Sequence, residues 1–395
     1  MEKYILTAII LCFSLTGCFM QTQTEEIAQE VVQVQPIFQE QQIDLYIKNE
    51  FELGPYEPTE GIYLGAYMGN RDLVDPFELV MDTQMAFKVL QYSRRNSITS
   101  SDILACIANK QIPYIKFLLD PDDPAANLYY LIGDISSMYQ TPIFIELYPI
   151  TSDITDPRDY KEKYIEAYQL IKKYVPEAVI VWSMDSTEIQ NLTMFYPGDF
   201  YVDWVGLNIY MTKYVNQELA EYNISKEIDL WYKTYQANKP LIISGLAISN
   251  FSSIDHTYTI ADAKNKLTYF YNELPTQYPR IKAMLYVDVD MRQYSGYDDF
   301  RISLDSDIVQ HVRSLWASDI FLHEVSANAN VVNGQYIKYT LPSYLYDETY
   351  YVSDYYLEAI IDSVTLKEVN TFKDLEGNVY YPMDELCEII DGYFQ

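Results

Sequence analysis

The segment FYPGDFYVDWVGLNIY, residues 195–210, ends in WVGLNIY (204–210), an almost uninterrupted apolar run. Such a run is typical of a parallel strand that is buried on both faces of its sheet. Other segments share this character: GIYLGAY (61–67), MAFKVLQY (85–92), PYIKFLL (113–119), PIFIELY (142–148), AVIVWSM (178–184), PLIISGL (240–246) and KAMLYVDV (282–289). Together they predict eight strands in the middle of the chain.

Amphipathic segments separate these strands, with apolar residues at three- and four-residue spacing. The clearest are SDILACIANK (101–110), DYKEKYIEAYQLIKKY (159–174), EIDLWYKTYQA (227–237) and ADAKNKLTYFYNEL (261–274). Eight alternations of strand and helix match an α/β fold of the (β/α)8 TIM-barrel type, which we expect over residues 58–320. A doubly wound open sheet is the main rival, but no Gly-rich dinucleotide fingerprint follows the first strand.

The composition excludes some partners. The chain has 395 residues, of which 49% are hydrophobic, and 27 Lys and Arg stand against 57 Asp and Glu, giving a net charge of −30. This charge repels phosphate backbones, so we expect no nucleic-acid partner. The 40 tyrosines offer flat apolar faces with one polar group, which suit stacking on sugar rings. A bias toward Tyr codons in the genome explains their number equally well.

The N-terminus predicts export and lipidation. MEKYILTAIILCFSLTGC (1–18) has a short apolar run that is typical of a signal peptide. Its end, Leu15 to Cys18, resembles the bacterial lipobox, which implies removal of residues 1–17 and acylation of Cys18, by palmitate among other chains. The expected location is therefore the bacterial cell envelope, periplasmic or surface-exposed, with the lipid as the membrane contact. Residues 18–57 are rich in Gln and Glu and are predicted to form a flexible tether. Of the remaining cysteines in the mature chain, Cys106 and Cys387 are predicted to be buried.

The barrel region resembles glycoside hydrolase family 26, the β-mannanase-like group. The resemblance is carried by Tyr-Pro-Gly-Asp-x-Tyr-Val-Asp-Trp-Val-Gly within 195–210, and by PIFIELYP (142–149), KPLIISGLA (239–247), YPRIKAMLYVDVD (278–290) and DFRISLDSDIVQHVRSL (299–315). In that family the fourth strand ends Arg-x-x-His-Glu, with Glu as the general acid/base, and the seventh strand carries the nucleophilic Glu. The resemblance thus implies a carbohydrate substrate class and no cofactor.

This chain departs from the family at both catalytic positions. Aligning the fourth strand puts Glu146 at the family's Arg, Pro149 at its His and Ile150 at its acid/base Glu. Aligning the seventh strand puts Gly245 at the nucleophile. A retaining glycosidase needs two carboxyl groups about 5–5.5 Å apart, and Ile and Gly supply neither. We therefore expect a catalytically degenerate barrel.

Other acids lie near the C-terminal ends of predicted strands, where TIM barrels place their chemistry. Glu146, Asp185, Asp288 and Asp290 are the fallback acids. Asp288 and Asp290 alternate along one strand and can share a proton or a cation there. The three histidines show no ligand spacing, so no metal site is predicted.

Aromatic residues supply the predicted carbohydrate contacts. Tyr148, Trp182 and Tyr210 fall at or near C-terminal strand ends, where the resemblance implies a sugar-stacking surface. Packing within the barrel is the alternative role for all three. Trp204 begins its strand and is predicted to belong to the core.

Residues 321–395 are predicted to form a small α+β accessory module. IKYTLPSYLY (337–346), DSVTLKEVNTF (362–372), the turn DLEGN (374–378) and VYYPMDELCEIIDGY (379–393) suggest strands followed by a short helix. The ending resembles the small repeat at the N-terminus of copper amine oxidases, which implies a non-catalytic module without copper ligands.

The sequence thus favours an envelope lipoprotein that binds a polysaccharide, an oligosaccharide or an envelope protein without cleaving it. One alternative is an active endo-glycosidase of β-mannanase or β-glucanase type with relocated carboxylates. The other is a structural envelope protein that has no glycan site.

Overall fold

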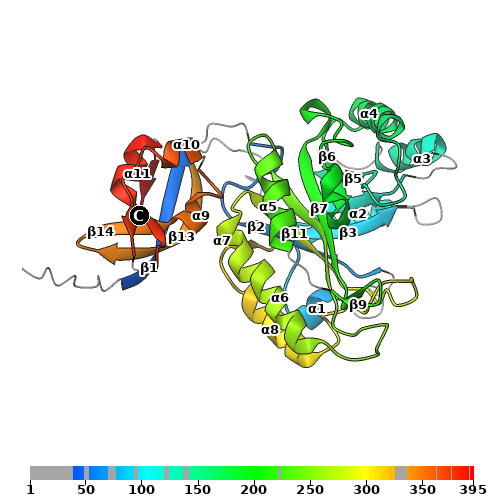
Figure 1. Cartoon of the computed structure of the whole chain (residues 1–395). Coiled ribbons are helices and arrows are strands. Elements are labelled where there is room, and N and C mark those ends of the chain that lie inside the picture. Colours follow the sequence, from blue (N-terminus) through cyan, green and yellow to red (C-terminus); the bar gives the residue numbers. More distant parts are fainter. Residues whose placement is uncertain are drawn as a thin grey trace, which may run out of the picture. The chain divides into compact units, whose positions relative to one another are not determined.

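The computed structural model describes residues 39–48, 53–69, 77–92, 97–119, 124–136, 142–220, 224–324, 336–361, 363–374, 376–390 and 392–395. Its larger part is a closed barrel of eight parallel strands, in which β11 pairs with β2 to complete the ring (Figure 1). The strands are β2 (Ile62–Tyr67), β3 (Phe87–Tyr92), β4 (Ile112–Phe117), β5 (Ile143–Leu147), β6 (Ala178–Asp185), β7 (Trp204–Met211), β10 (Leu241–Ile248) and β11 (Ile281–Val287). This confirms the predicted (β/α)8 fold.

Helices lie outside the barrel strands (Figure 1). They are α1 (Phe77–Met81), α2 (Ser100–Ala108), α3 (Pro124–Ser136), α4 (Pro157–Tyr174), α5 (Ile224–Tyr235), α6 (Ile260–Thr268), the π-helical η4 (Tyr269–Glu273), α7 (Leu274–Gln277) and α8 (Ser306–Trp316). Shorter elements are the 3₁₀ helices η2 (Ser186–Asn191) and η3 (Asp199–Tyr201) and the hairpin β8 (Tyr214–Val215) and β9 (Glu218–Leu219). Local signals match these bounds: Thr99 and Asp102 form a capping box for α2, and Asp156 caps α4 ahead of Pro157.

Alternation along the strands separates two cores. Tyr63, Phe87, Phe144 and Trp204 belong to a cluster inside the barrel, where the rings of Phe144 and Trp204 lie 5.4 Å apart. Their neighbours along the strands face outward and join the core between the sheet and the helices. Because successive side chains of a strand point to opposite sides, this register fixes which residues enter the barrel.

The motif in residues 195–210 links the start of β7 to β6, to α4 and to the segment before the barrel. Asp203 accepts hydrogen bonds from the backbone N–H of Ile180 and from Lys172, both at 2.8 Å. The indole N–H of Trp204 donates to the carbonyl of Pro55 at 2.8 Å. Trp204 is therefore a core residue, as the sequence predicted.

The C-terminal module contains a six-stranded sheet ordered β15-β16-β14-β13-β1-β17. Its strands are β1 (Gln39–Lys48), β13 (Tyr336–Tyr346), β14 (Thr349–Ser353), β15 (Phe372–Lys373), β16 (Val379–Pro382) and β17 (Gly392–Phe394). Three helices accompany them: α9 (Asp354–Leu357), α10 (Ser363–Leu366) and α11 (Met383–Ile389). Leu45, Leu341, Val352, Met383 and Leu386 form its buried core.

Two domain limits differ from the prediction. Residues 39–48 were expected in the tether but form β1, which pairs antiparallel with β13 along its whole length and also with β17. Ile43 and Leu45 alternate with polar neighbours and are buried, so this segment has the pattern of a half-buried strand. At the other limit, β12 (Phe321–Leu322) pairs with β2 and extends the barrel sheet beyond residue 320. Residues 1–38, which include Cys18, lie outside the described part of the chain.

Candidate functional site: a polar layer at the barrel mouth

A layer of polar side chains lies inside the barrel above its apolar base. Lys116 of β4, Glu146 of β5, Ser183 of β6 and Asn208 of β7 supply it. Each of them lies two or four positions after a residue of the cluster inside the barrel. Because alternate residues of a strand share a face, these side chains also point toward the barrel axis. TIM barrels carry their chemistry at this C-terminal end of the strands.

Glu146 is the centre of this layer and is completely buried. Its Oε2 lies 2.9 Å from the Nζ of Lys116, while its Oε1 accepts hydrogen bonds from Ser183 Oγ at 2.6 Å and Asn208 Nδ2 at 3.1 Å. Lys116 also donates to Asn208 Oδ1 at 3.2 Å. A buried carboxylate held by a cation and two further donors is fixed in place as a structural group.

Gly245, which the sequence predicts to align with the family's nucleophile, borders the same layer. A Cβ on Gly245 would lie 2.5 Å from Asn208 Oδ1 and 3.4 Å from Lys116 Nζ. Real Cβ atoms do not approach a neighbour as closely as 2.5 Å, so the side chain of Asn208 would have to shift to admit any side chain at residue 245. The side chains of Asn208 and Lys116 therefore pack closely against the backbone at residue 245.

Ile150, at the family's acid/base position, is fully buried in the core outside the barrel. Its backbone pairs with β6: its N–H donates to the carbonyl of Ser183, and its carbonyl accepts from the N–H of Asp185, both at 2.9 Å. An apolar side chain directed into this core cannot donate a proton to a glycosidic oxygen.

Asp185 is a fallback acid that lies at the end of a barrel strand and has a raised pKa. It ends β6 and pairs in register with Asn208 of β7. Burial raises its pKa from 3.8 to about 7; the Lys116 ammonium opposes this rise and the nearby Glu146 and Glu188 carboxylates add to it. A carboxyl group with a pKa near neutrality is suited to donating a proton.

The other two fallback acids have separate partners, so they do not form a shared proton or cation site. Asp288 is fully buried and accepts hydrogen bonds from the N–H of Ser303 at 3.1 Å and its Oγ at 2.6 Å. Asp290 forms ion pairs with Arg292 at 2.6 Å and Arg301 at 3.1 Å. Within the described residues, no cluster of three or more His, Cys, Asp or Glu side chains has the arrangement of a metal site.

Two of the three predicted sugar-stacking residues are buried elsewhere, which corrects the prediction. Trp182 precedes the inward-facing Ser183 and so points outward, where it packs edge-on against Tyr196 and Tyr235 at 5.0 and 5.7 Å. Tyr148 is only 2% exposed and packs against Phe117 at 5.4 Å. Neither ring can offer a face to a sugar in this conformation.

Tyr210 does lie at the mouth and is partly exposed. Its ring packs edge-on against Tyr297 at 5.6 Å and Phe300 at 6.1 Å. Burial raises the pKa of its hydroxyl, and the Asp185 carboxylate adds to this effect, so the phenol stays protonated at neutral pH. Tyr67 belongs to the same apolar group, and its hydroxyl donates to Gln91 at 2.6 Å.

Lys116, Ser183 and Asn208 were not among the site residues predicted from the sequence. Each interrupts an apolar strand with a polar residue on the side that faces the barrel axis, which is the signal that strand alternation offered. Tyr67 and Tyr297 were also not predicted as site residues. Tyr297 lies in a loop far from Tyr210 in the sequence.

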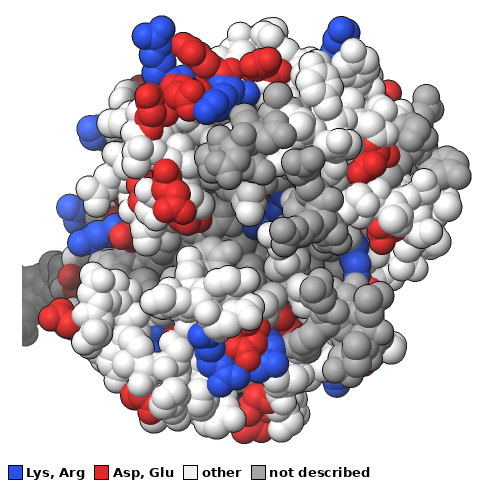
Figure 2. Space-filling model, turned by 90° about the vertical axis from the view of Figure 1, so that its right-hand side faces the viewer, with Lys and Arg blue, Asp and Glu red and all other residues white. Residues whose placement is uncertain are grey.

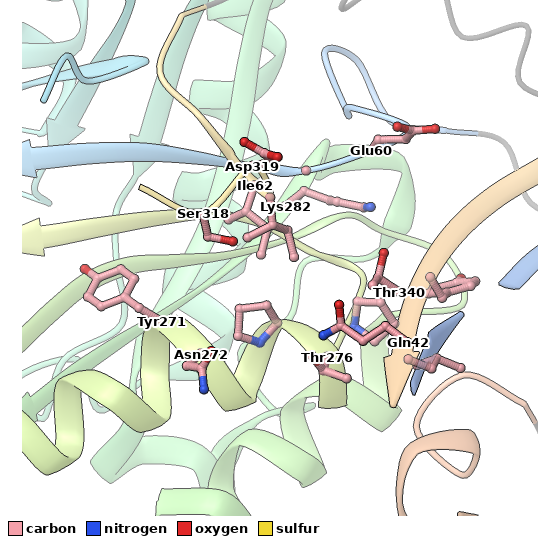
Figure 3. Close-up of a pocket in the computed structure, with 16 residues that line it drawn as sticks. Gln42, Glu60, Ile62, Tyr271, Asn272, Thr276, Lys282, Ser318, Asp319 and Thr340 are labelled. Carbon is pink, nitrogen blue, oxygen red and sulfur yellow. The ribbon is translucent and has the colours of Figure 1, made fainter. Parts of the chain in front are cut away.

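The face of the molecule that carries β9 in Figure 1 is turned toward the viewer in Figure 2. It is hollowed, and Lys and Arg side chains lie there beside Asp and Glu. A further cavity, of about 450 Å³, is lined by Glu60, Asn272, Thr276, Lys282 and Asp319, among others. Figure 3 shows Lys282 extending into it on the side of Glu60 and Thr340. These residues do not include the family's catalytic positions.

Comparison with known proteins agrees with this architecture. The model of glycosyl hydrolase family 26 matches residues 150–280. Two curated β-1,3-xylanases, from an Alcaligenes and a Vibrio species, are 29% and 30% identical over 111 residues, which is 27% of this chain. These matches span 22% and 23% of the two xylanases.

Solved structures share the fold. A modular endo-β-1,4-mannanase from Cellulomonas fimi superimposes with a TM-score of 0.53 and 12% identity, over 71% of this chain and 79% of that one. GH26C from a Muricauda species gives a TM-score of 0.50 and 10% identity, over 67% and 87% of the respective chains. The resemblance to family 26 and the barrel fold are thereby confirmed. In the described residues, no helix is both long enough and apolar enough to span a bilayer.

Proposed function

We propose that this chain binds a polysaccharide or oligosaccharide at the barrel mouth without hydrolysing it. The proposal rests on one observation above all: residue 245 is a glycine, and the place of its missing Cβ lies 2.5 Å from Asn208 Oδ1, so this position carries no carboxylate. A glycosidase that has lost its nucleophile retains the surface around it. Such a surface still binds sugars if its aromatic and polar groups remain.

The acids in the mouth do not replace the missing pair. Glu146 is closed off by Lys116, Ser183 and Asn208, and its charge is already neutralised. Attack on an anomeric carbon requires a carboxylate that is accessible to the sugar. Of the two carboxylates that act on Asp185, Glu146 and Glu188, the first is therefore held in the polar layer and cannot attack a sugar.

Sugar contact at the mouth is supported by Tyr210 and Tyr297. Their edge-to-face arrangement, with centroids 5.6 Å apart, gives two ring surfaces at different angles. Aromatic faces bind the apolar faces of pyranose rings, and hydroxyl and carboxyl groups nearby supply the hydrogen bonds.

The cellular setting belongs to the same proposal. Lipid attached to Cys18 would hold the barrel at the bacterial envelope, where extracellular glycans are encountered. The support is the Leu-Thr-Gly-Cys sequence at 15–18 after an apolar run. Mass spectrometry of the membrane fraction tests it: the mature N-terminus should be acylated Cys18, and Cys18→Ser should release the chain from membranes.

An active glycosidase is the second candidate, and the pKa of Asp185 is what favours it. With a pKa of about 7, this carboxyl group is protonated in a large fraction of molecules at neutral pH and can act as a general acid. In that case water must attack without a carboxylate nucleophile at residue 245. Hydrolysis would then be lost in Asp185→Asn.

The test uses the chain without residues 1–18 and a panel of β-1,4-mannan, β-glucans, β-1,4-xylan and β-1,3-xylan. Reducing ends report hydrolysis, and retardation in affinity gels reports binding. We expect retardation without hydrolysis. Hydrolysis that disappears in Asp185→Asn would support the active enzyme instead. If the chain shows no hydrolysis and no retardation, a structural role in the envelope would remain as its function.

A further inference from the structure

Beyond the central mouth, a groove crosses the loops that follow β10 and β11. We call it the rim groove and define it by Phe251, Tyr258, Asp290, Arg292, Asp299 and Arg301. We propose that the rim groove is a binding subsite for a neutral oligosaccharide. This inference rests on the proposed carbohydrate binding and assigns it to residues that the family's catalytic positions do not include.

The groove has the size of a ligand site. One cavity of about 490 Å³ is lined by Phe251, Tyr258, Arg292 and Arg301, among others. A second, of about 570 Å³, is lined by Ser253, His256, Asp290, Arg292 and Gln293. Arg292 lines both cavities, so both lie against this side chain. Small-molecule sites in proteins have volumes of roughly 300–1,000 Å³.

An aromatic platform forms one wall of the groove. Tyr258 is 72% exposed, which is high for so large a ring, and it meets Phe251 edge-on at 4.9 Å. The guanidinium of Arg292 lies 5.0 Å from the centre of the Phe251 ring. An exposed ring backed by a second ring offers a flat apolar surface to a sugar at little cost in side-chain entropy.

The charges of the groove favour a neutral ligand. Arg292 and Arg301 are both paired with Asp290 and Asp299, so two positive charges meet two negative ones. A uronate or a phosphate would meet no uncompensated cation here and would also be repelled by the net charge of −30. Sugar hydroxyls, which both donate and accept, match carboxylates and guanidinium groups that lie side by side.

Arg292 keeps donors available for such hydroxyls. Its hydrogen bonds to Asp290 use Nε at 2.9 Å and Nη2 at 2.6 Å. A guanidinium has five N–H groups, so Nη1 remains for a ligand within the described surroundings. The side chain is 38% exposed, which lets a sugar reach it.

The groove is preorganised by backbone hydrogen bonds between its two loops. Asn250 N–H donates to the carbonyl of Asp299, and Asp299 N–H donates to that of Phe251, both at 3.0 Å. Asp298, one residue earlier, accepts from the N–H groups of Lys213 and Ser253 at 2.8 and 2.7 Å. A ligand binding here would therefore order little additional chain, which favours measurable affinity.

The barrel centre is the less suitable place for a sugar ring. Asn208 Oδ1 and the Nζ of Lys116, which pairs with Glu146, lie 2.5 and 3.4 Å from the place of a Cβ at Gly245, so polar side chains already surround this residue. A glycan held by the rim groove would cross the mouth without entering it. This arrangement would allow the chain to bind a glycan without a catalytic pair.

The experiment measures affinity of the chain without residues 1–18 for mannohexaose, cellohexaose and xylohexaose by titration calorimetry. Hexagalacturonate serves as the anionic probe. The variants are Tyr258→Ala and Arg292→Gln, with Tyr129→Ala as a matched control, because Tyr129 is 61% exposed on α3. A further variant, Tyr210→Ala, reports on the central mouth.

We expect Tyr258→Ala to weaken binding of the best neutral hexaose about tenfold, the value of one lost aromatic stack. Arg292→Gln should weaken it in the same direction, Tyr129→Ala should not, and hexagalacturonate should bind less well than the neutral sugars. Unchanged affinity in both groove variants, with loss in Tyr210→Ala, would overturn the rim groove and leave the proposed function intact. Tighter binding of hexagalacturonate would overturn the neutral ligand. Absence of binding to every probe would instead remove the proposed function, and this inference with it.

Discussion

The Nζ of Lys116 lies 2.9 Å from the Oε2 of Glu146 inside the barrel, with Glu146 fully buried and the lysine side chain 15% exposed. Ser183 and Asn208 complete the hydrogen bonding of this carboxylate. These four residues therefore link the neighbouring strands β4, β5, β6 and β7 in the polar layer of the mouth. Its value to the fold depends on both partners being present.

Removing one partner of this pair should destabilise the chain strongly. Lys116→Met leaves a buried carboxylate without its cation, and we expect a loss of about 3–5 kcal/mol in the free energy of unfolding. The double variant Lys116→Met with Glu146→Leu should recover much of this loss. Chemical denaturation measures all three proteins.

The matched control for that comparison is the exposed pair Arg158–Glu162, whose side chains are 88% and 69% exposed. Its removal should change the free energy of unfolding by no more than about 0.5 kcal/mol. A loss of that size for Lys116→Met as well would show that the buried pair does not support the fold.

Adding a side chain at residue 245 should be costly because of Asn208. Gly245→Ala places a Cβ 2.5 Å from Asn208 Oδ1, and we expect a destabilisation of about 1–3 kcal/mol. In an Asn208→Ala background the same substitution should cost less, since its obstacle is gone. A double-mutant cycle measures this coupling.

Gly133 offers the comparison for residue 245. It lies in α3, and nothing approaches within 4 Å of a Cβ added there. Gly133→Ala should stabilise the chain by up to about 1 kcal/mol, since alanine favours a helix. Equal effects at residues 133 and 245 would contradict the role assigned to Asn208.

The raised pKa of Asp185 predicts a specific pH dependence. The folded state holds this proton up to a pH of about 7, whereas the unfolded chain releases it near 3.8. The folded state therefore binds more protons between these values, and its stability falls as the pH rises through this window. Asp185→Asn should raise the free energy of unfolding at pH 8, by on the order of 1 kcal/mol or more, and leave it nearly unchanged near pH 4.

Denaturation midpoints at several pH values test this expectation, with Asp153→Asn as the control because Asp153 is exposed. A difference between Asp185→Asn and the parent that does not vary with pH would show that the carboxyl group titrates normally.

Lys282 predicts the opposite pH trend. It is 3% exposed, its Nζ donates to the carbonyl of Thr59 at 3.4 Å, and burial lowers its pKa from 10.5 to about 8. Between these values the unfolded chain binds more protons, so the stability contributed by this residue rises with pH. Lys282→Met should therefore stabilise the chain at pH 7, by about 2–3 kcal/mol, and the gain should shrink as the pH approaches 10.

Thermal or chemical unfolding of Lys282→Met across that pH range measures the effect, and Lys226→Met, at an exposed position, provides the control. Destabilisation by Lys282→Met at pH 7 would mean that the ammonium has a compensating partner in the folded state.

Much of the fold was predictable because the signal is local. The eight apolar runs became the eight barrel strands, and the amphipathic segments between them became helices. The segment 39–48 has the alternation of a half-buried strand, but its partners β13 and β17 lie at the other end of the chain, and the alternation alone does not show that such partners exist.

The candidate site was predictable only in its position. Strand ends indicated where Asp185 and Tyr210 would lie, and both are at the mouth. Trp182 and Tyr148 were assigned to the mouth by their nearness to strand ends, but the side chain of Trp182 follows the outward register and Tyr148 packs against Phe117. A position along a strand does not specify its face until one inward-facing residue is known.

The sequence by itself determined the barrel, through the burial and spacing of its strands, and it predicted that Ile150 and Gly245 align with the family's catalytic positions. Only the tertiary structure decided which side chains meet inside the barrel. Lys116, Glu146, Ser183 and Asn208 come from four separate strands and meet because barrel closure brings their inward faces together. Such contacts depend on the register between strands, a property of the closed sheet that no single segment carries.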